Sequence, residues 1–230
     1  MRIANGRERR AAGSTAPRHR HDQAYAAIVL RGGYEESGNR GRFRVGPGDV
    51  LFHNAFDAHL DRFNARGADI LNIELHSLPA FMSGRVRDAD EIAHLAMSDI
   101  EAARQRLFGG LIETQPLAQD WQDKLANDLL AQPELRLDAW ALRHGLAAET
   151  LSRGFGRLYG VTPAEFRAEA RAHCALDGIL RSCAPLADIA ARTGHADQAH
   201  MTRAVKALTG ASPRHWRASN PFKTAADEIG

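Results

Sequence analysis

The chain has 230 residues, of which 44% are hydrophobic and 25% are charged, and its formal net charge is +2 at pH 7. This length is sufficient for two domains, and the composition excludes disordered and collagen-like chains. No apolar run approaches the ~18 residues of a membrane span, and no apolar segment of a secretory signal follows the N-terminal arginines. We therefore expect a reduced, cytoplasmic protein. Its two cysteines, Cys174 and Cys183, would lie roughly 13 Å apart along one helix, too far for a disulfide.

The first third of the chain combines short apolar runs with glycine and proline turns. Residues 1–17 are basic and unpatterned, and we expect a frayed lead-in there with a strand near Ile3. The residues that follow predict strands at 25–30, 42–45, 50–52 and 68–75, a turn into a further strand at Gly32-Gly33 and a tight turn at 46–49. Short strands with turns every roughly 8–12 residues are typical of a small β-barrel or jelly roll.

Three histidines of this region match a metal-ligand pattern. His19-Arg20-His21, and the turn at 46–49 followed by His59, resemble the two motifs of the cupin family. Alternate residues of a strand point to one face, so His19 and His21 would lie together, and His59 could complete a three-nitrogen site for Zn, Fe, Ni or Mn. The cupin pattern also has a Glu a few residues after the second His, and residues 24–26 offer none. A metal-free pocket lined by these histidines, and simple surface histidines, are the alternatives.

Residues 80–132 are acidic, with 5 Lys and Arg against 9 Asp and Glu. Asp88 or Asp90 could cap a helix whose apolar residues face one way. These residues are Ile92, Leu95, Ala96, Ile100, Ala103 and Leu107. From its residues alone, this helix is expected to pack on its own barrel. A next helix is marked by Trp121, Leu125, Leu129 and Leu130, and ends at Pro133.

Residues 137–217 contain an internal repeat. The same kinds of residue return after 49 positions in the first part of the repeat and after 50 in the second. The first copy has Leu137, Trp140, Ala141, Gly145, Leu151, Arg153, Phe155, Leu158, Gly160, Pro163, Phe166 and Arg167. The second has, in the same order, Leu186, Ile189, Ala190, Gly194, Met201, Arg203, Val205, Leu208, Gly210, Pro213, Trp216 and Arg217. Two copies favour a pair of globular subdomains over a solenoid, which needs three or more units.

Each copy predicts two short helices joined by a tight turn. The first helix, at roughly 138–144 or 186–192, ends at a glycine, which can adopt the left-handed backbone conformation. The second helix carries an apolar stripe at period 3.6 and ends at another glycine, before Thr162-Pro163 or Ser212-Pro213. This is the helix-turn-helix pattern, whose second helix fits the major groove of DNA.

The polar face of each second helix carries side chains that could contact DNA. Cationic and amide groups reach base edges and phosphates, and hydroxyls donate to phosphate oxygens. The candidates are Glu149, Thr150, Ser152, Arg153 and Arg157 in the first copy, and Gln198, His200, Thr202, Arg203 and Lys206 in the second. A solvated helix face is the alternative, but Arg153 and Arg203 match in register. Residues 133–220 hold 12 Lys and Arg against 8 Asp and Glu, and this net charge of +4 is modest for a DNA-binding domain.

The same region resembles the DNA-binding domain of the AraC family of bacterial transcription regulators. The resemblance covers about 100 residues, including the runs LSRGFGRLYGVTPAEFRAEARAHCALDGIL and LADIAARTGHADQAHMTRAVKALTGASPRHWR. It implies two subdomains joined by a long helix at 163–181, and recognition helices in successive turns of the major groove. It also implies base-reading positions at Glu149, Ser152, Arg153, Gln198, His200 and Arg203. The second copy departs from the family at Gly194-His195, Met201 and Val205, so we expect a looser second subdomain.

Family members commonly carry a cupin-like domain as their effector sensor, so the two resemblances agree. We expect an α+β chain, with a cupin-like β-barrel followed by an all-α domain of two helix-turn-helix subdomains. The expected domains are a cupin-like effector-sensing domain at 1–79, a helical linker or dimerisation segment at 80–119, an AraC-type tandem helix-turn-helix DNA-binding domain at 120–220 and a tail at 221–230.

The leading hypothesis is a sequence-specific transcription regulator without catalytic residues. It would bind double-stranded DNA and respond to a small-molecule effector or a divalent metal in the barrel. We expect a homodimer, with RNA polymerase as a further partner and no membrane association. The alternative is a metal-dependent cupin enzyme or metal sensor that uses His19, His21 and His59. A third hypothesis is a sensor that acts through protein contacts alone, with a degenerate second subdomain.

Overall fold

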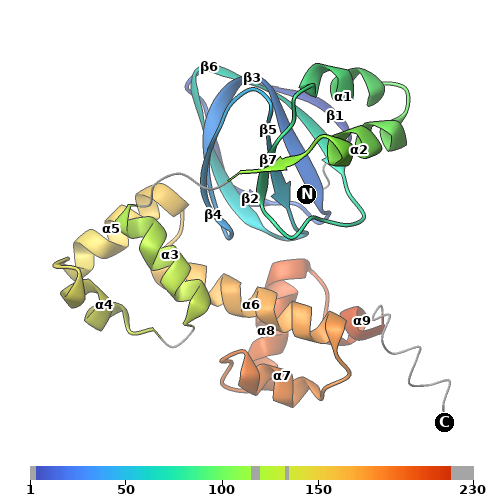
Figure 1. The fold of residues 1–230 in the computed structure, drawn as a ribbon. Helices are drawn as coiled ribbons and strands as arrows, with labels where there is room; N and C mark the ends of the chain where they lie inside the picture. The colour runs from blue at the N-terminus through green and yellow to red at the C-terminus, as the bar shows by residue number, and fades with distance from the viewer. Residues whose placement is uncertain (1–3, 115–119, 133–134, 219–230) are drawn as a thin grey trace, which may run out of the picture. The chain divides into compact units, whose positions relative to one another are not determined.

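The computed structural model describes residues 4–114, 120–132 and 135–218 (Figure 1). The predicted strand near Ile3, the helix end at Pro133 and the tail at 221–230 lie outside the described residues. Contacts divide the chain into two compact units, residues 1–123 with 158–160, and residues 124–157 with 161–230. None of the described helices is long and apolar enough to cross a membrane.

The first unit is built on an antiparallel sheet that curves into a barrel (Figure 1). Its strands are β1 (Gly6–Arg10), β2 (Thr15–Arg20), β3 (Tyr25–Gly38), β4 (Gly41–Val45), β5 (Asp49–His53), β6 (Ala58–Glu74), β7 (Ser83–Arg85) and β8 (Ile112–Glu113). The expectation of a frayed lead-in over 1–17 is wrong, because β1 and the start of β2 both pair with β6. The segment Gly6–Arg10 reads GRERR and has no apolar residue, so only its backbone pairing makes it a strand.

The two longest strands, β3 and β6, continue without a reverse turn. The expected turn at Gly32-Gly33 is wrong: β3 continues through it, with shifts of register against β6 on either side of Gly32. A Cβ atom on Gly32, whose φ is +71°, would lie 2.0 Å from the carbonyl oxygen of Gly67 on β6. The backbones of β3 and β6 therefore approach each other so closely at this point that only glycine fits. The bend lets each of these long strands continue from one side of the barrel to the other.

Alternate residues of the strands serve two hydrophobic cores. On β3, Tyr25, Ala27 and Val29 face the inside of the barrel. Ala26, Ile28 and Leu30 face the opposite side, where they pack with residues of α1 (Ala89–Leu95) and α2 (Ile100–Gly109). Both faces of the strand are buried, which explains why the sequence at 25–30 is continuously apolar rather than alternating.

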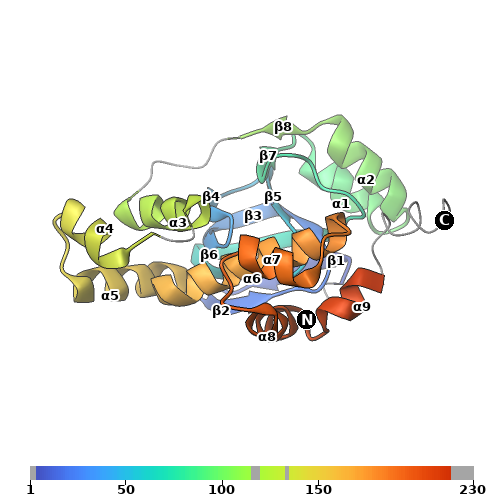
Figure 2. The same ribbon diagram turned by 90° about the horizontal axis from the view of Figure 1, so that it is seen from below.

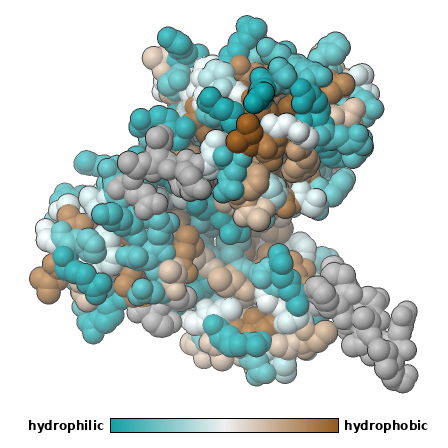
Figure 3. Space-filling view, in the orientation of Figure 1, coloured by the Kyte–Doolittle hydropathy of each residue, from teal (hydrophilic) through white to brown (hydrophobic). Residues whose placement is uncertain are grey.

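The acidic segment forms two helices, not the single helix expected. The chain leaves the helical conformation after α1, and the carboxylate of Asp99 accepts hydrogen bonds from the backbone N–H groups of Glu101 and Ala102 to begin α2. The buried residues Ile92, Ala103 and Leu107 belong to the same core as the outer face of the sheet. Of the two alternatives for this stripe, the structure shows packing on its own barrel. On the face drawn in Figure 3, hydrophobic residues are scattered among hydrophilic ones.

The helical part follows the predicted repeat. Its helices are α3 (Trp121–Ala131), α4 (Leu137–Arg143), α5 (Ala148–Tyr159), α6 (Pro163–Arg181), α7 (Leu186–Arg192), α8 (Gln198–Thr209) and α9 (Pro213–Ala218). The long helix α6 runs from the α4–α5 pair to the α7–α8 pair (Figure 2). Glycines 145, 160, 194 and 210 all have φ between +66° and +79°, as the two pairs of helix ends require. Thr162 begins α6 with a reciprocal capping box to Glu165.

Each helix pair contains an equivalent hydrogen bond from an arginine side chain to the backbone. Arg167 donates a hydrogen bond of 2.9 Å to the carbonyl of Leu135, two residues before α4. Arg217 donates one of 2.9 Å to the carbonyl of Ala184, two residues before α7. Each arginine thus fixes the entry to the first helix of its own copy. The repeated arginine in the sequence reflects a repeated structural function.

Candidate DNA-binding face and barrel cavity

The helices α5 and α8 separate buried and exposed residues by side. In α8, the predicted stripe of Met201, Val205 and Leu208 is buried. In α5, Leu151 and Phe155 are buried as predicted, but Tyr159 replaces Leu158 as the third fully buried residue. The Tyr159 hydroxyl donates a 2.9 Å hydrogen bond to Asp123, so a partner for its polar end makes this burial favourable.

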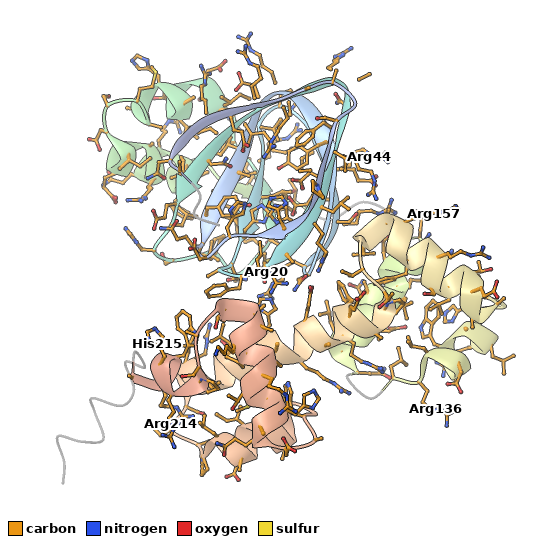
Figure 4. All side chains as sticks on the ribbon, turned by 180° about the vertical axis from the view of Figure 1, so that it is seen from behind. Arg20, Arg44, Arg136, Arg157, Arg214 and His215 are labelled. Atoms are coloured by element: carbon orange, nitrogen blue, oxygen red, sulfur yellow. The ribbon has the colours of Figure 1, made fainter. Side chains whose placement is uncertain are left out.

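The predicted DNA-contact residues lie on the other side of these helices. Nine of them are exposed: Glu149, Thr150, Ser152, Arg153, Arg157, Gln198, His200, Arg203 and Lys206. Thr202 is half-buried, and its hydroxyl donates to the carbonyl of Gln198 at 2.8 Å within α8. Figure 4 shows Arg157 at the surface of α5. The two helices therefore present polar faces of similar make-up.

The N-terminus of α8 is fixed by local hydrogen bonds. The Asp197 carboxylate accepts from the backbone N–H of His200 at 2.6 Å, so it caps the helix. His195, where the sequence departs from the family pattern, is buried in the preceding turn, and its Nδ1 lies 2.9 Å from the Thr193 hydroxyl. The buried imidazole of His195 thus has a polar partner within the turn.

In α5, Arg153 is held only weakly. Its guanidinium lies 3.4 Å from the Glu149 carboxylate one helical turn earlier, and both side chains are largely exposed. Exposed pairs at this spacing contribute about 0.3–0.5 kcal/mol. The arginine can therefore exchange this partner for a phosphate or a base edge at little cost.

The second candidate site is a cavity of about 310 Å³ inside the barrel. His59 on β6 lies directly opposite His19 on β2 in the strand ladder, and their ring centroids are 4.3 Å apart. His21, just beyond β2, lies with its ring 5.0 Å from that of His19. The candidate ligand atoms of these three histidines lie within 4.8 Å of one another. The structure thus brings together the three side chains that the sequence singled out.

The cavity also contains side chains that sequence reasoning missed as site residues. Glu36 on β3 pairs directly with Asp61 on β6, and both carboxyl groups are buried. His53 on β5 pairs with Tyr25 on β3, and their rings stack at 4.4 Å between centroids. No sequence motif marks these residues. Placing them in the cavity requires the register of β3 against both β5 and β6. Glu36 brings a carboxyl group close to the histidine cluster. It lies further along the chain, on β3, than residues 24–26, where the cupin pattern has its Glu.

Burial favours the neutral form of three imidazoles of this cavity, those of His19, His53 and His59. Loss of hydration lowers the pKa of His53 to about 3 and holds the pKa of His59 well below its ordinary value. Burial also lowers the pKa of His19. Neutral imidazoles are the form that binds metal ions. The Nδ1 of His19 lies 2.8 Å from the carbonyl of Pro17, a contact that would leave Nε2 as the electron-pair donor.

The cavity passes a chemical test for cation binding. Among the described residues, His53 Nε2, His59 Nδ1 and Asp61 Oδ1 are buried without a hydrogen-bond partner. Buried polar atoms of this kind are rare, because each costs about 1–3 kcal/mol. The donor set of imidazoles and carboxylates therefore fits a divalent metal ion better than an apolar molecule.

A comparison with protein-family models agrees with the helical part of this description. A family model described as "Helix-turn-helix domain" matches residues 140–219. No curated protein matches the chain. Among solved structures, the C-terminal domain of AraT, a response regulator from Geobacillus stearothermophilus, is 21% identical, with a TM-score of 0.41 over 44% of this chain and 86% of that one.

Two further solved structures resemble larger or different parts of the chain. ToxT from Vibrio cholerae strain SCE256, in complex with an unsaturated fatty acid, is 9% identical, with a TM-score of 0.42 over 93% of this chain and 94% of that one. KdgF from a Halomonas species is 17% identical, with a TM-score of 0.26 over 28% of this chain and 59% of that one.

The match at 140–219 covers α5 to α9 and all but the first three residues of α4. Its two second helices are buried on one side and polar on the other, as groove-binding helices must be. A DNA-binding domain accounts for the polar faces of α5 and α8. The chain thus carries an AraC-type helix-turn-helix domain at residues 140–219.

Proposed function

We propose that the chain is a transcription regulator of the AraC family, that it reads a specific DNA sequence with α5 and α8, and that a small ligand or metal in the barrel cavity controls this reading. The observation that carries the first part is the equivalence of the two helix pairs. Arg153 and Arg203 occupy the same position in their copies, and both are exposed. One arginine on each of two equivalent helices suits bidentate contacts to two successive major grooves.

The remaining polar side chains divide between base edges and phosphates. Base contacts are proposed for Glu149, Ser152, Arg153, Gln198, His200 and Arg203. Thr150, Arg157, Thr202 and Lys206 would contact phosphates, with Thr202 first giving up its bond to Gln198. The modest charge of the domain makes phosphate contacts alone a weak source of affinity, so base contacts must supply specificity.

The test is DNA binding by arginine variants. An operator is first selected from random DNA with the full-length protein. Arg203→Ala and Arg153→Ala should each weaken binding to it by about 1–3 kcal/mol and relax the preference at one base position. Arg181→Ala, which removes an exposed arginine of α6 paired with Asp177, is the control for loss of charge. Operator affinity and sequence preference unchanged in both recognition-helix variants would refute the assignment.

The sensing function rests on the cavity and its polar lining. The predicted set His19, His21 and His59 is the first candidate for a metal, and a metal-free pocket for a polar effector is the second. Metal analysis of the purified protein distinguishes them, with the double variant His19→Ala/His21→Ala as the comparison. A stoichiometric metal in the wild type would favour a metal sensor, and its loss in the double variant would assign the ion to these histidines. Absence of any metal would favour an organic effector.

The remaining features of the proposal concern assembly and location. We place the regulator in the cytoplasm as a homodimer that can also contact RNA polymerase, with a sensing domain at 1–79, a linker at 80–119 and a DNA-binding domain at 120–220. Packing of the α1 and α2 stripes on their own sheet leaves only other surfaces of these helices for a dimer contact. Light scattering at several concentrations measures the oligomeric state, and a monomer at the concentration of operator binding would exclude the dimer.

A further inference from the structure

A second group of potential ligands shares His59 with the predicted set. Glu36 on β3, His53 on β5 and His59 on β6 have candidate ligand atoms within 4.8 Å of one another. The Nε2 of His53 lies 3.6 Å from a Glu36 carboxylate oxygen. The rings of His53 and His59 are 4.7 Å apart at their centroids. All three side chains are buried, whereas His19 in the predicted set is only half-buried.

Glu36 lies among other buried carboxyl groups. It faces Asp61 directly across the β3–β6 ladder, and both side chains are buried. Asp61 is also a hydrogen-bond partner of the Glu36 carboxyl group. A buried carboxylate in this position must therefore hold a proton or face a positive ion.

The imidazoles of the same group are also incomplete. His53 Nε2 and His59 Nδ1 have no hydrogen-bond partner among the described residues, and each residue is only 4% exposed. Two electron-pair donors and a buried carboxyl group meet at one place. This is the donor set that zinc and ferrous iron bind as two histidines and one carboxylate.

The carboxyl group of Glu36 favours the set Glu36, His53 and His59 over the three histidines His19, His21 and His59 as the metal site. Three neutral imidazoles would leave the full charge of a dication inside the barrel, where charge is costly. Glu36 would compensate half of that charge. We propose that Glu36, His53 and His59 form a binding site for one divalent transition-metal ion of the zinc or ferrous class, with the remaining coordination positions open to the barrel cavity. The site concerns the barrel alone, so it stands or falls independently of the DNA contacts of α5 and α8.

The experiment titrates the full-length protein, freed of metal by a chelator, with Co²⁺ and Zn²⁺. Visible absorption of Co²⁺ and calorimetry of Zn²⁺ should both give one ion per chain. Glu36→Gln and His53→Asn should each weaken binding at least 100-fold, while His76→Ala, at an exposed histidine outside the cavity, should not change it. His19→Ala/His21→Ala should keep the stoichiometry of one.

Two outcomes would overturn the assignment. Failure of the wild type to bind either ion excludes the site, and loss of binding in the His19/His21 double variant alone assigns the ion to the other histidines. X-ray absorption of the zinc-loaded wild type adds a result that does not depend on the folding of variants. It should show two imidazoles and oxygen ligands, and three imidazoles would contradict the proposal.

Discussion

The paired arginines at the helix entries allow a quantitative test of the repeat. Arg167 and Arg217 are half-buried, and each donates one hydrogen bond of 2.9 Å to a backbone carbonyl that precedes the first helix of its copy. Arg→Met at either position removes the donor but keeps the length of the apolar stem. Hydrogen bonds to charged groups contribute about 1.5–3 kcal/mol, and partial exposure allows water to replace part of each bond. We therefore expect each variant to lose about 1.5 kcal/mol of unfolding free energy.

Urea unfolding followed by tryptophan fluorescence measures this loss. The three tryptophans are Trp121, Trp140 and Trp216, so the signal reports on the helical part of the chain. Arg153→Met is the matched control, since Arg153 pairs with the exposed Glu149 at 3.4 Å, and it should change stability by less than about 0.5 kcal/mol. Equal losses in all three variants, or no loss at Arg167 and Arg217, would show that the two hydrogen bonds do not fix the helix entries.

Three further predictions follow from the same structure. Thr162→Ala removes the side-chain half of the α6 capping box and should cost about 1 kcal/mol in urea unfolding, whereas Thr162→Ser should cost little. Phe155→Ala empties a fully buried position that contacts Phe166 at 5.4 Å between rings, and should cost about 3–5 kcal/mol; a cost below 1 kcal/mol would contradict this packing. In metal-free protein, burial raises the pKa of Asp61 from its ordinary 3.8 to about 7, so the native state holds a proton that the unfolded chain releases. The unfolding free energy should therefore fall as pH rises through this window, with a shallower fall in Asp61→Asn; a thermal stability that rises with pH equally in both proteins would refute it.

The helical part could be predicted closely because its contacts are local. Glycines 145, 160, 194 and 210 follow the helices of the two pairs, and α6 begins and ends at the predicted residues 163 and 181. The stripe of α8 was also correct in every position. The exception is the third buried residue of α5, where Tyr159 outcompetes Leu158 through a hydrogen bond to α3 that no local pattern contains.

The barrel was harder to predict because its strands depend on distant partners. The polar strand β1 exists only through its pairing with β6, and the bend of β3 exists only because Gly67 of β6 approaches Gly32. The break between α1 and α2 follows from Asp99, a capping residue that a continuous apolar pattern concealed. In each case a non-local or competing local contact overrode the hydrophobic period.

The same division applies to the sites. The repeat, the polar faces of α5 and α8 and the proximity of His19 to His21 could be read from the order of residues, because spacing along one element fixes which side chains share a face. Only the tertiary structure decided that Glu36 and His53 join that histidine cluster. Their positions follow from the register of three strands, and register is set by pairing across the sheet rather than by the order of residues along the chain.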